Sequence, residues 1–171
     1  MRTPLLFLCL FFCSVACDSG ERPRTATDPG TTTVYLVRHA EKGEGSDPDL
    51  LPEGAERAER LAGLLDGEEL SAIYTTDTRR TRQTAAPVAE RQGLSPTLYD
   101  AGELEQIAQG IRTDRRGTAV LVVGHSNTTP ALARLLSASD AVPEITEEDF
   151  GTLIVVTIPQ TGPAEVATRN Y

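Results

Sequence analysis

The two histidines of the chain each come soon after an apolar segment. His39 follows residues 34–37 and Arg38, and His125 follows residues 120–123. An imidazole can take up a proton or attack an electrophile near neutral pH. If both segments are parallel strands of an open α/β sheet, their carboxyl ends share the edge where such folds bind ligands. Two histidines and an arginine there predict an anion site, although either histidine taken alone could simply form a loop hydrogen bond.

The elements that must position these side chains follow from the hydrophobic pattern. Short apolar runs alternate with stretches of helical periodicity, Pro52 is typical of a helix start, and Gly93 is typical of a helix end. This alternation predicts a three-layer α/β/α sandwich with a mostly parallel central sheet. The pattern predicts strands over residues 33–37, 71–75, 97–99 and 118–123, helices over 52–65, 78–92, 103–112 and 127–136, and a closing hairpin of 153–158 and 164–169.

The first 31 residues are expected to lie outside this domain, which we place at 32–171. Residues 1–16 have one charge, Arg2, then an apolar run too short to span a membrane, and small residues before Cys17. We therefore predict a signal peptide over 1–16, lipidation of Cys17 and a flexible polar tether over 17–31. The protein would be an extracytoplasmic lipoprotein of a bacterium, in the periplasm or on the cell surface. The alternatives are free secretion, or an apolar segment that belongs to the core.

Composition limits the partners of the chain. It has 25 acidic and 16 basic residues, a net charge of −9. Such a balance argues against nucleic acid, because binding to a duplex requires a basic face. Membrane contact is expected only through the lipid anchor. All three cysteines lie within the first 17 residues, so the domain must be stable without an internal disulfide.

Four segments, in order, resemble the motifs of the histidine phosphatase superfamily, the branch that includes the phosphoglycerate mutases. Residues 37–41 (VRHAE) resemble its Arg-His-Gly motif, and residues 49–54 (DLLPEG) resemble the start of its first helix. Residues 75–85 (TTDTRRTRQTA) are similar to its second signature, and residues 122–127 (VVGHSN) are similar to its late Gly-His motif. The resemblance implies a phosphoglycerate mutase-like fold and a metal-independent phosphatase without cofactors. Its substrate would be a phosphorylated small molecule or a phosphoprotein.

The same resemblance implies a role for each matching residue. His39 would be the nucleophile that forms a phosphohistidine intermediate, with one ring nitrogen free to attack and the other donating a hydrogen bond. The groups that hold the phosphoryl oxygens share a positive charge or an N–H donor, and by position they would be Arg38, Arg80, His125 and the amides of Ser126 and Asn127.

The proton donor for the leaving group is open. Asp100 ends the third strand, where the family carries a carboxylic acid, and Glu103 is its rival. Asp100 could equally cap the next helix, or the protein could lack a dedicated acid. The chain also departs from the family at Ala40, which replaces the usual glycine.

Two other functions fit some of these residues. A non-catalytic phosphate-binding lipoprotein would retain the pocket, and Ala40 together with the unsettled acid favours it. A metal-dependent hydrolase would use both histidines, but they lack a ligand spacing such as His-x-x-x-His. Substrate specificity would lie in residues 43–50, in residues 140–151 with Phe150, and around Lys42.

Overall fold

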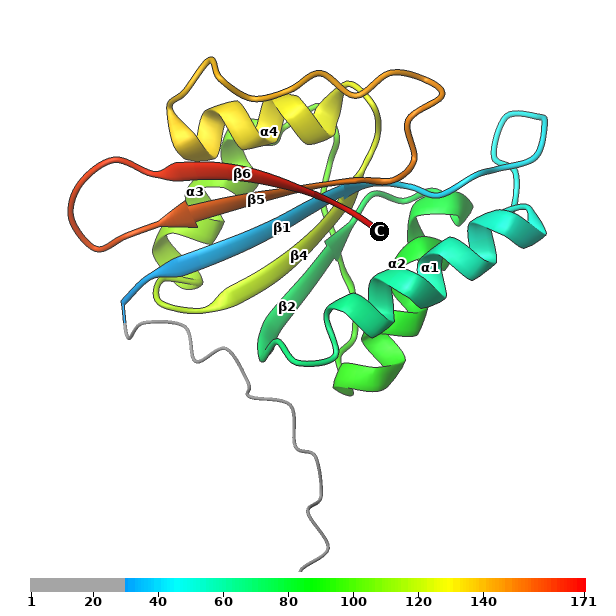
Figure 1. Cartoon of the computed structure of the whole chain (residues 1–171), viewed down its shortest axis with the longest axis horizontal. Coiled ribbons are helices and arrows are strands. Elements are labelled where there is room, and N and C mark those ends of the chain that lie inside the picture. The colour runs from blue at the N-terminus through cyan, green and yellow to red at the C-terminus, as the bar shows by residue number, and fades with distance from the viewer. Residues whose placement is uncertain (1–29) are drawn as a thin grey trace, which may run out of the picture.

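Strands alternate with helices through most of the described chain, residues 30–171 of the computed structural model (Figure 1). Each element begins and ends within about two residues of the bounds expected from the sequence, which is ordinary variation for element ends. The elements in chain order are β1 (Thr32–Arg38), α1 (Pro52–Leu64), β2 (Leu70–Thr75), α2 (Arg79–Gln92), β3 (Thr97–Leu98), α3 (Leu104–Asp114), β4 (Ala119–Gly124), α4 (Thr128–Ser137), β5 (Thr152–Ile158) and β6 (Glu165–Asn170).

The expected signal peptide, the lipidation of Cys17 and nearly all of the tether concern residues outside the described range, and they stay predictions. Among residues 30–171, no helix has both the length and the apolarity that crossing a bilayer requires.

The sheet has the strand order β3-β2-β4-β1-β5-β6. β1, β2, β3 and β4 pair in parallel, whereas β5 pairs antiparallel with both β1 and β6. The expected mostly parallel sheet and closing hairpin are therefore confirmed. Since the parallel strands point the same way, the loops after β1, β2 and β4 all leave the sheet at one edge, toward the right of Figure 1.

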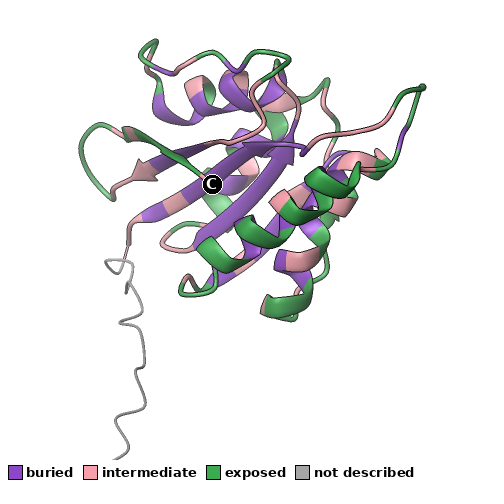
Figure 2. Ribbon diagram, turned by 45° about the vertical axis from the view of Figure 1, so that its right-hand side comes forward, coloured by how far each residue is buried: buried purple, intermediate pink, exposed green. Residues whose placement is uncertain are grey.

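Burial explains the place of each strand in the sheet. β4, the sequence AVLVVG, is buried at every residue, as a strand with helices over both faces should be (Figure 2). β6, the sequence EVATRN, is polar and almost wholly exposed, which suits an edge strand. The apolar strands thus lie at the centre of the sheet. The residues that directly follow β1 and β4 are therefore held in place by these strands.

Helices cover both faces of the sheet, so the three-layer prediction is correct. One apolar cluster joins α1 and α2 to the sheet through residues such as Leu61 and Val88. A second cluster joins α3 and α4 to the opposite face through residues such as Ile111 and Leu136. α2 ends where the sequence predicts, because Gly93 adopts the left-handed φ of +64° and its amide caps the last turn.

The loop after β1 is held against α1 by close backbone packing. A Cβ on Gly54, in the first turn of α1, would lie 2.2 Å from the carbonyl oxygen of Glu41. Only glycine fits there. On the outer side of the contact, the guanidinium of Arg57 donates to both carboxylate oxygens of Glu41 at 2.6–2.9 Å. The chain just after His39 is therefore fixed to the first helix.

Candidate active site

The pairing of β1 with β4 brings the two histidines together. In this parallel pair Arg38 lies opposite Gly124, so the next residues leave the sheet side by side. The amide of His39 extends the pairing by donating to the carbonyl of Gly124 at 3.0 Å. The rings of His39 and His125 are 5.5 Å apart between centroids, with 69° between their planes. Both imidazoles therefore belong to one site at the carboxyl edge of the sheet.

The surroundings of His39 select one form of its ring. The residue is 3% exposed, and its Nδ1 lies 2.8 Å from the carbonyl oxygen of Ala40. A carbonyl oxygen only accepts, so Nδ1 must carry the proton and donate, which leaves a lone pair on Nε2. Burial lowers the pKa of His39 to about 4, and the positive charges of Arg38 and Arg80 act in the same direction. The ring is therefore neutral at pH 7, with one nitrogen free to attack.

Arg38 lies beneath the segment that leads into β5. Its guanidinium is 3% exposed, and Nη1 donates to the carbonyls of Thr146 at 2.8 Å and Glu147 at 2.6 Å, with a longer bond to Asp149 at 3.3 Å. Nη2 donates to the Glu147 carboxylate at 2.7 Å, and the ring of Phe150 lies 4.1 Å from the guanidinium carbon. Burial lowers the pKa of Arg38, and Glu147 opposes this shift. The Nε group is buried without a hydrogen-bond partner.

Arg80, in the first turn of α2, contributes the second guanidinium. Its side chain is 17% exposed, its Nη1 lies 3.6 Å from the Asp47 carboxylate, and its Nε is buried without a partner. Its positive charge lowers the pKa of both histidines. Arg79 and Arg82 differ from it, since both are more than half exposed and pair with aspartates at the surface. Two arginines thus each keep one buried N–H with no acceptor from the described residues.

Threonines that sequence reasoning did not single out tie these groups together. The hydroxyl of Thr84 accepts from the amide of Ala40 at 2.9 Å and donates to the carbonyl of Arg80 at 2.8 Å. The hydroxyl of Thr76 lies 3.0 Å from Nε2 of His125. Burial, and then the nearby arginines, lowers the pKa of His125. The threonine-rich run after β2 was the available signal, because short hydroxyl side chains satisfy polar groups at crowded strand ends.

The residues after His125 begin α4. The amide of His125 donates to the hydroxyl of Thr128 at 2.9 Å, which fixes the turn. The hydroxyl of Ser126 donates to Glu147 at 2.5 Å, so Ser126 lies at the site. Asn127 is the N-terminal flanking residue of the helix, and its exposed side chain makes no capping bond. Glu147 lies within residues 140–151, where we expect substrate specificity, but no sequence motif marks it as a site residue.

The two carboxylates considered as proton donors lie between β3, at the edge of the sheet, and α3. Asp100 accepts a hydrogen bond from the amide of Gly102 at 2.8 Å, so it stabilises the turn before α3. Asp100 and Glu103 line a cavity with residues of β2, β3 and α3, and no described hydrogen bond joins either to His39. β3 lies outside β2 at the edge of the sheet. The assignment of Asp100 or Glu103 as the proton donor therefore stays a prediction. The helix-capping alternative does not describe Asp100, because the residue that flanks the start of α3 is Glu103.

The arrangement is suited to a tetrahedral anion. Two guanidinium groups and two imidazoles converge at one strand edge, and each arginine has a buried N–H to offer. Among residues 30–171, no group of three or more His, Cys, Asp and Glu side chains is arranged to hold a metal ion. Arginines can stabilise negative charge here, and a neutral His39 with a lone pair on Nε2 can act as a nucleophile.

Part of the chain is similar in sequence to a known protein family. Residues 34–102 match the family model of the histidine phosphatase superfamily, branch 1. Phosphoserine phosphatase 1 of Hydrogenobacter thermophilus is 37% identical over 75 residues, which are 39% of this chain and 36% of that protein. The match therefore spans about a third of the length of this relative.

Comparison with solved structures extends the likeness to most of the described chain. The structure of the protein histidine phosphatase SixA complexed with tungstate has a TM-score of 0.67 at 20% identity, covering 81% of this chain and 96% of that chain. A protein of Nakamurella multipartitia assigned as a phosphohistidine phosphatase SixA has a TM-score of 0.61 at 26% identity, covering 84% and 98%. The fold is thus the one expected from the sequence.

Proposed function

We propose that the chain belongs to the histidine phosphatase superfamily, whose family model matches residues 34–102, and that it is a metal-independent phosphatase acting through a phosphohistidine intermediate on His39. The observation that carries the proposal is the state of that imidazole. It is buried and neutral, its Nδ1 is bound to the Ala40 carbonyl at 2.8 Å, and its Nε2 is left with a lone pair beside two arginines. A nucleophile in this state needs no separate base to activate it.

The reaction has two steps. In the first, Nε2 of His39 attacks phosphorus in line with the ester oxygen, the N–P bond forms as the P–O bond breaks, and the leaving oxygen takes a proton from solvent water. In the second, water attacks the same phosphorus, the N–P bond breaks, and inorganic phosphate leaves with the neutral imidazole restored. Both transition states spread negative charge over the equatorial oxygens.

The residues around His39 supply the matching positive charge. Arg38 and Arg80 would donate to non-bridging oxygens, starting with the Nε groups that have no partner among the described residues. His125, 5.5 Å from His39, would add a donor on a second side. Among the described residues no hydrogen bond joins Asp100 or Glu103 to the histidines, so we assign the proton of the leaving group to solvent. Substrates with a good leaving group, such as aryl esters or phosphorylated nitrogen, therefore fit the site best.

The substrate class is proposed from the relatives. They are named as a phosphoserine phosphatase and as phosphatases of protein phosphohistidine. We infer that this protein acts on small phosphate monoesters or on phosphorylated protein side chains.

The test is turnover of an aryl phosphate in the presence of EDTA by the wild type and by His39→Ala. We expect wild-type activity to be unchanged by EDTA and the variant to lose it by a factor of at least ~10³, because the nucleophile is gone. Asp100→Asn serves as the control and should retain nearly full activity. Loss of wild-type activity on chelation, or equal turnover by His39→Ala, would overturn the proposal. Tight phosphate binding without any turnover would favour a binding protein instead.

A further inference from the structure

Residues 146–150, which we call the strap, cross the candidate active site on their way into β5. Three backbone carbonyls of this segment accept from Nη1 of Arg38, and the ring of Phe150 lies over the same guanidinium. Figure 1 shows the chain between α4 and β5 passing over α4 and descending at the edge where β1 ends. The strap therefore covers the arginine that the phosphate would need.

The carboxylate of Glu147 bridges two donors of the site. Its Oε2 accepts from Nη2 of Arg38 at 2.7 Å, and its Oε1 accepts from the hydroxyl of Ser126 at 2.5 Å. The Ser126 hydrogen bond, and then the charge of Arg38, lowers the pKa of Glu147. An ionised carboxylate thus lies among the groups that converge on the nucleophile.

A carboxylate held in this way uses the donors that a phosphoryl group would use. Arginine binds both anions through the same fork of N–H groups. With Nη1 bound to carbonyls and one N–H of Nη2 bound to Glu147, the guanidinium of Arg38 keeps only Nε–H and the second N–H of Nη2 for a further acceptor. A phosphate dianion beside Glu147 would also be repelled by its charge, so the two anions exclude each other.

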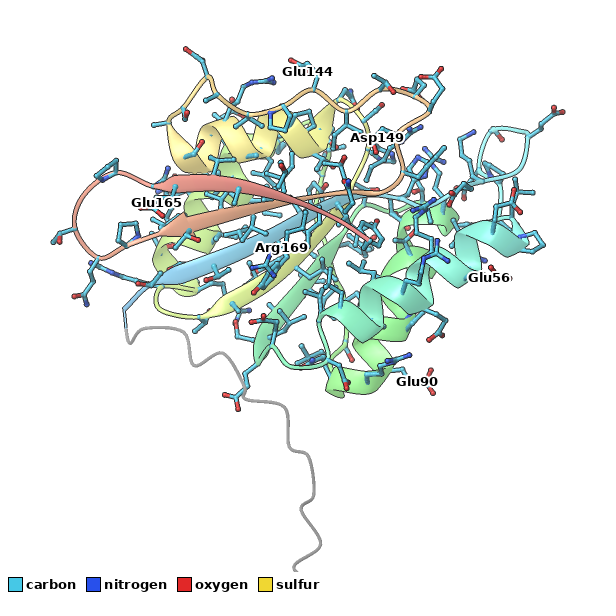
Figure 3. All side chains as sticks on the ribbon, in the orientation of Figure 1. Glu56, Glu90, Glu144, Asp149, Glu165 and Arg169 are labelled. Atoms are coloured by element: carbon cyan, nitrogen blue, oxygen red, sulfur yellow. The ribbon has the colours of Figure 1, made fainter. Side chains whose placement is uncertain are left out.

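The strap is fixed at both ends, and its backbone is also held by Arg38. On one side Val142 and Ile145 are buried in the core beneath it. On the other side Asp149 accepts from the amides of Gly151 and Thr152, which anchors the start of β5. Figure 3 shows Glu144 over the outer side of α4 and Asp149 beside β5.

Between these anchors the Glu147 side chain is 74% exposed. It can leave the site without unpacking any apolar group, since its side-chain bonds are those to Arg38 and Ser126.

We propose that Glu147 is a built-in competitor of the phosphoryl group: its carboxylate holds Arg38 and Ser126 until substrate displaces it. The phosphoryl nature of the displaced ligand rests on the proposed function, whereas the competition between Glu147 and an anion does not. Substrate affinity is then reduced by the fraction of molecules in which the carboxylate is seated. Glu147 sets the affinity of the site and takes no part in bond making.

The experiment is calorimetric titration of the purified protein with inorganic phosphate at pH 7.5. Glu147→Gln keeps the size of the side chain and removes its charge, and Glu148→Gln removes an adjacent charge that makes no described hydrogen bond. We expect the Kd for phosphate to fall by about tenfold in Glu147→Gln, as for a site that is open about a tenth of the time. It should change by less than about twofold in Glu148→Gln, because screened surface charges act weakly.

Kinetics with an aryl and an alkyl phosphate separate competition from chemistry. The proposal predicts that KM falls in Glu147→Gln while kcat is retained on both esters. An unchanged or raised Kd in Glu147→Gln would overturn the proposal. So would a fall in kcat confined to the alkyl ester, because that would make Glu147 the proton donor. Because phosphate binding needs no turnover, the titration still decides the role of Glu147 if the protein proves not to be a phosphatase.

Discussion

At the scale of single residues, the chemistry of the site depends on which ring and guanidinium nitrogens have a hydrogen-bond partner and which do not. The Nδ1 group of His39 has one acceptor, the adjacent carbonyl of Ala40, and this single bond decides which nitrogen attacks. Arg38 and Arg80 each keep a buried Nε without an acceptor among residues 30–171. Buried donors without partners are costly, so an anion that satisfies them is bound favourably.

The protonation state of His39 can be measured directly. Because burial lowers its pKa to about 4, the ring should stay neutral from pH 5 upward and become charged only near pH 4. The chain has two histidines, so NMR titration of the imidazole signals is simple, and His125→Asn assigns them. A midpoint for His39 close to the unperturbed value of about 6.5 would contradict the neutral nucleophile.

Two of the arginines of α2 offer a matched comparison. Arg80→Ala removes a guanidinium that is 17% exposed beside the histidines, whereas Arg82→Ala removes one that is 52% exposed. We expect kcat/KM for an aryl phosphate to fall by roughly 10²–10³ in Arg80→Ala, which is the usual loss for one donor to a developing charge. It should change by less than about threefold in Arg82→Ala. Equal losses would mean that Arg80 does not contact substrate.

At the scale of elements, periodicity was enough to place the strands and helices but not the connections between them. The buried run of β4 and the helical repeat of α1 are local patterns, and their bounds follow from neighbours in the chain. The role of Asp100 depended on whether β3 lies beside β4, and strand order is a property of long-range pairing. The sequence therefore predicted the histidine pair, whose strands adjoin, and left the proton donor open.

Two glycines of α1 test how the first helix is docked. A Cβ at Gly54 would lie 2.2 Å from the backbone of Glu41, whereas the nearest atom to a Cβ at Gly63 is 3.9 Å away. Gly54→Ala should lower the free energy of unfolding by about 2 kcal/mol or more, because the backbone must move apart. Gly63→Ala should raise it by about 0.5–1 kcal/mol through helix propensity. Denaturant titration checks both, and a Gly54→Ala protein as stable as the wild type would disprove the contact.

At the scale of the whole molecule, a site with two arginines lies in a protein of negative net charge. The net charge is −9, yet two arginines meet at one edge of the sheet. The contact between Arg38 and Glu147 joins residues that are 109 positions apart in the sequence. Residues 138–151 contain no helix or strand, so no periodicity marks which of their carboxylates turns inward. The cations of the site could thus be predicted, and the anion that opposes them could not.

The central claim is that phosphorus becomes bonded to His39 during turnover. Acid-sensitive, alkali-stable label should appear on the wild-type protein when its reaction with a radiolabelled phosphate monoester is stopped with alkali within milliseconds, because phosphohistidine survives base. Mass spectrometry should place the phosphoryl group on the peptide that contains His39, and His39→Ala should carry none. Label on another residue, or full turnover by a protein that never carries label, would contradict the account.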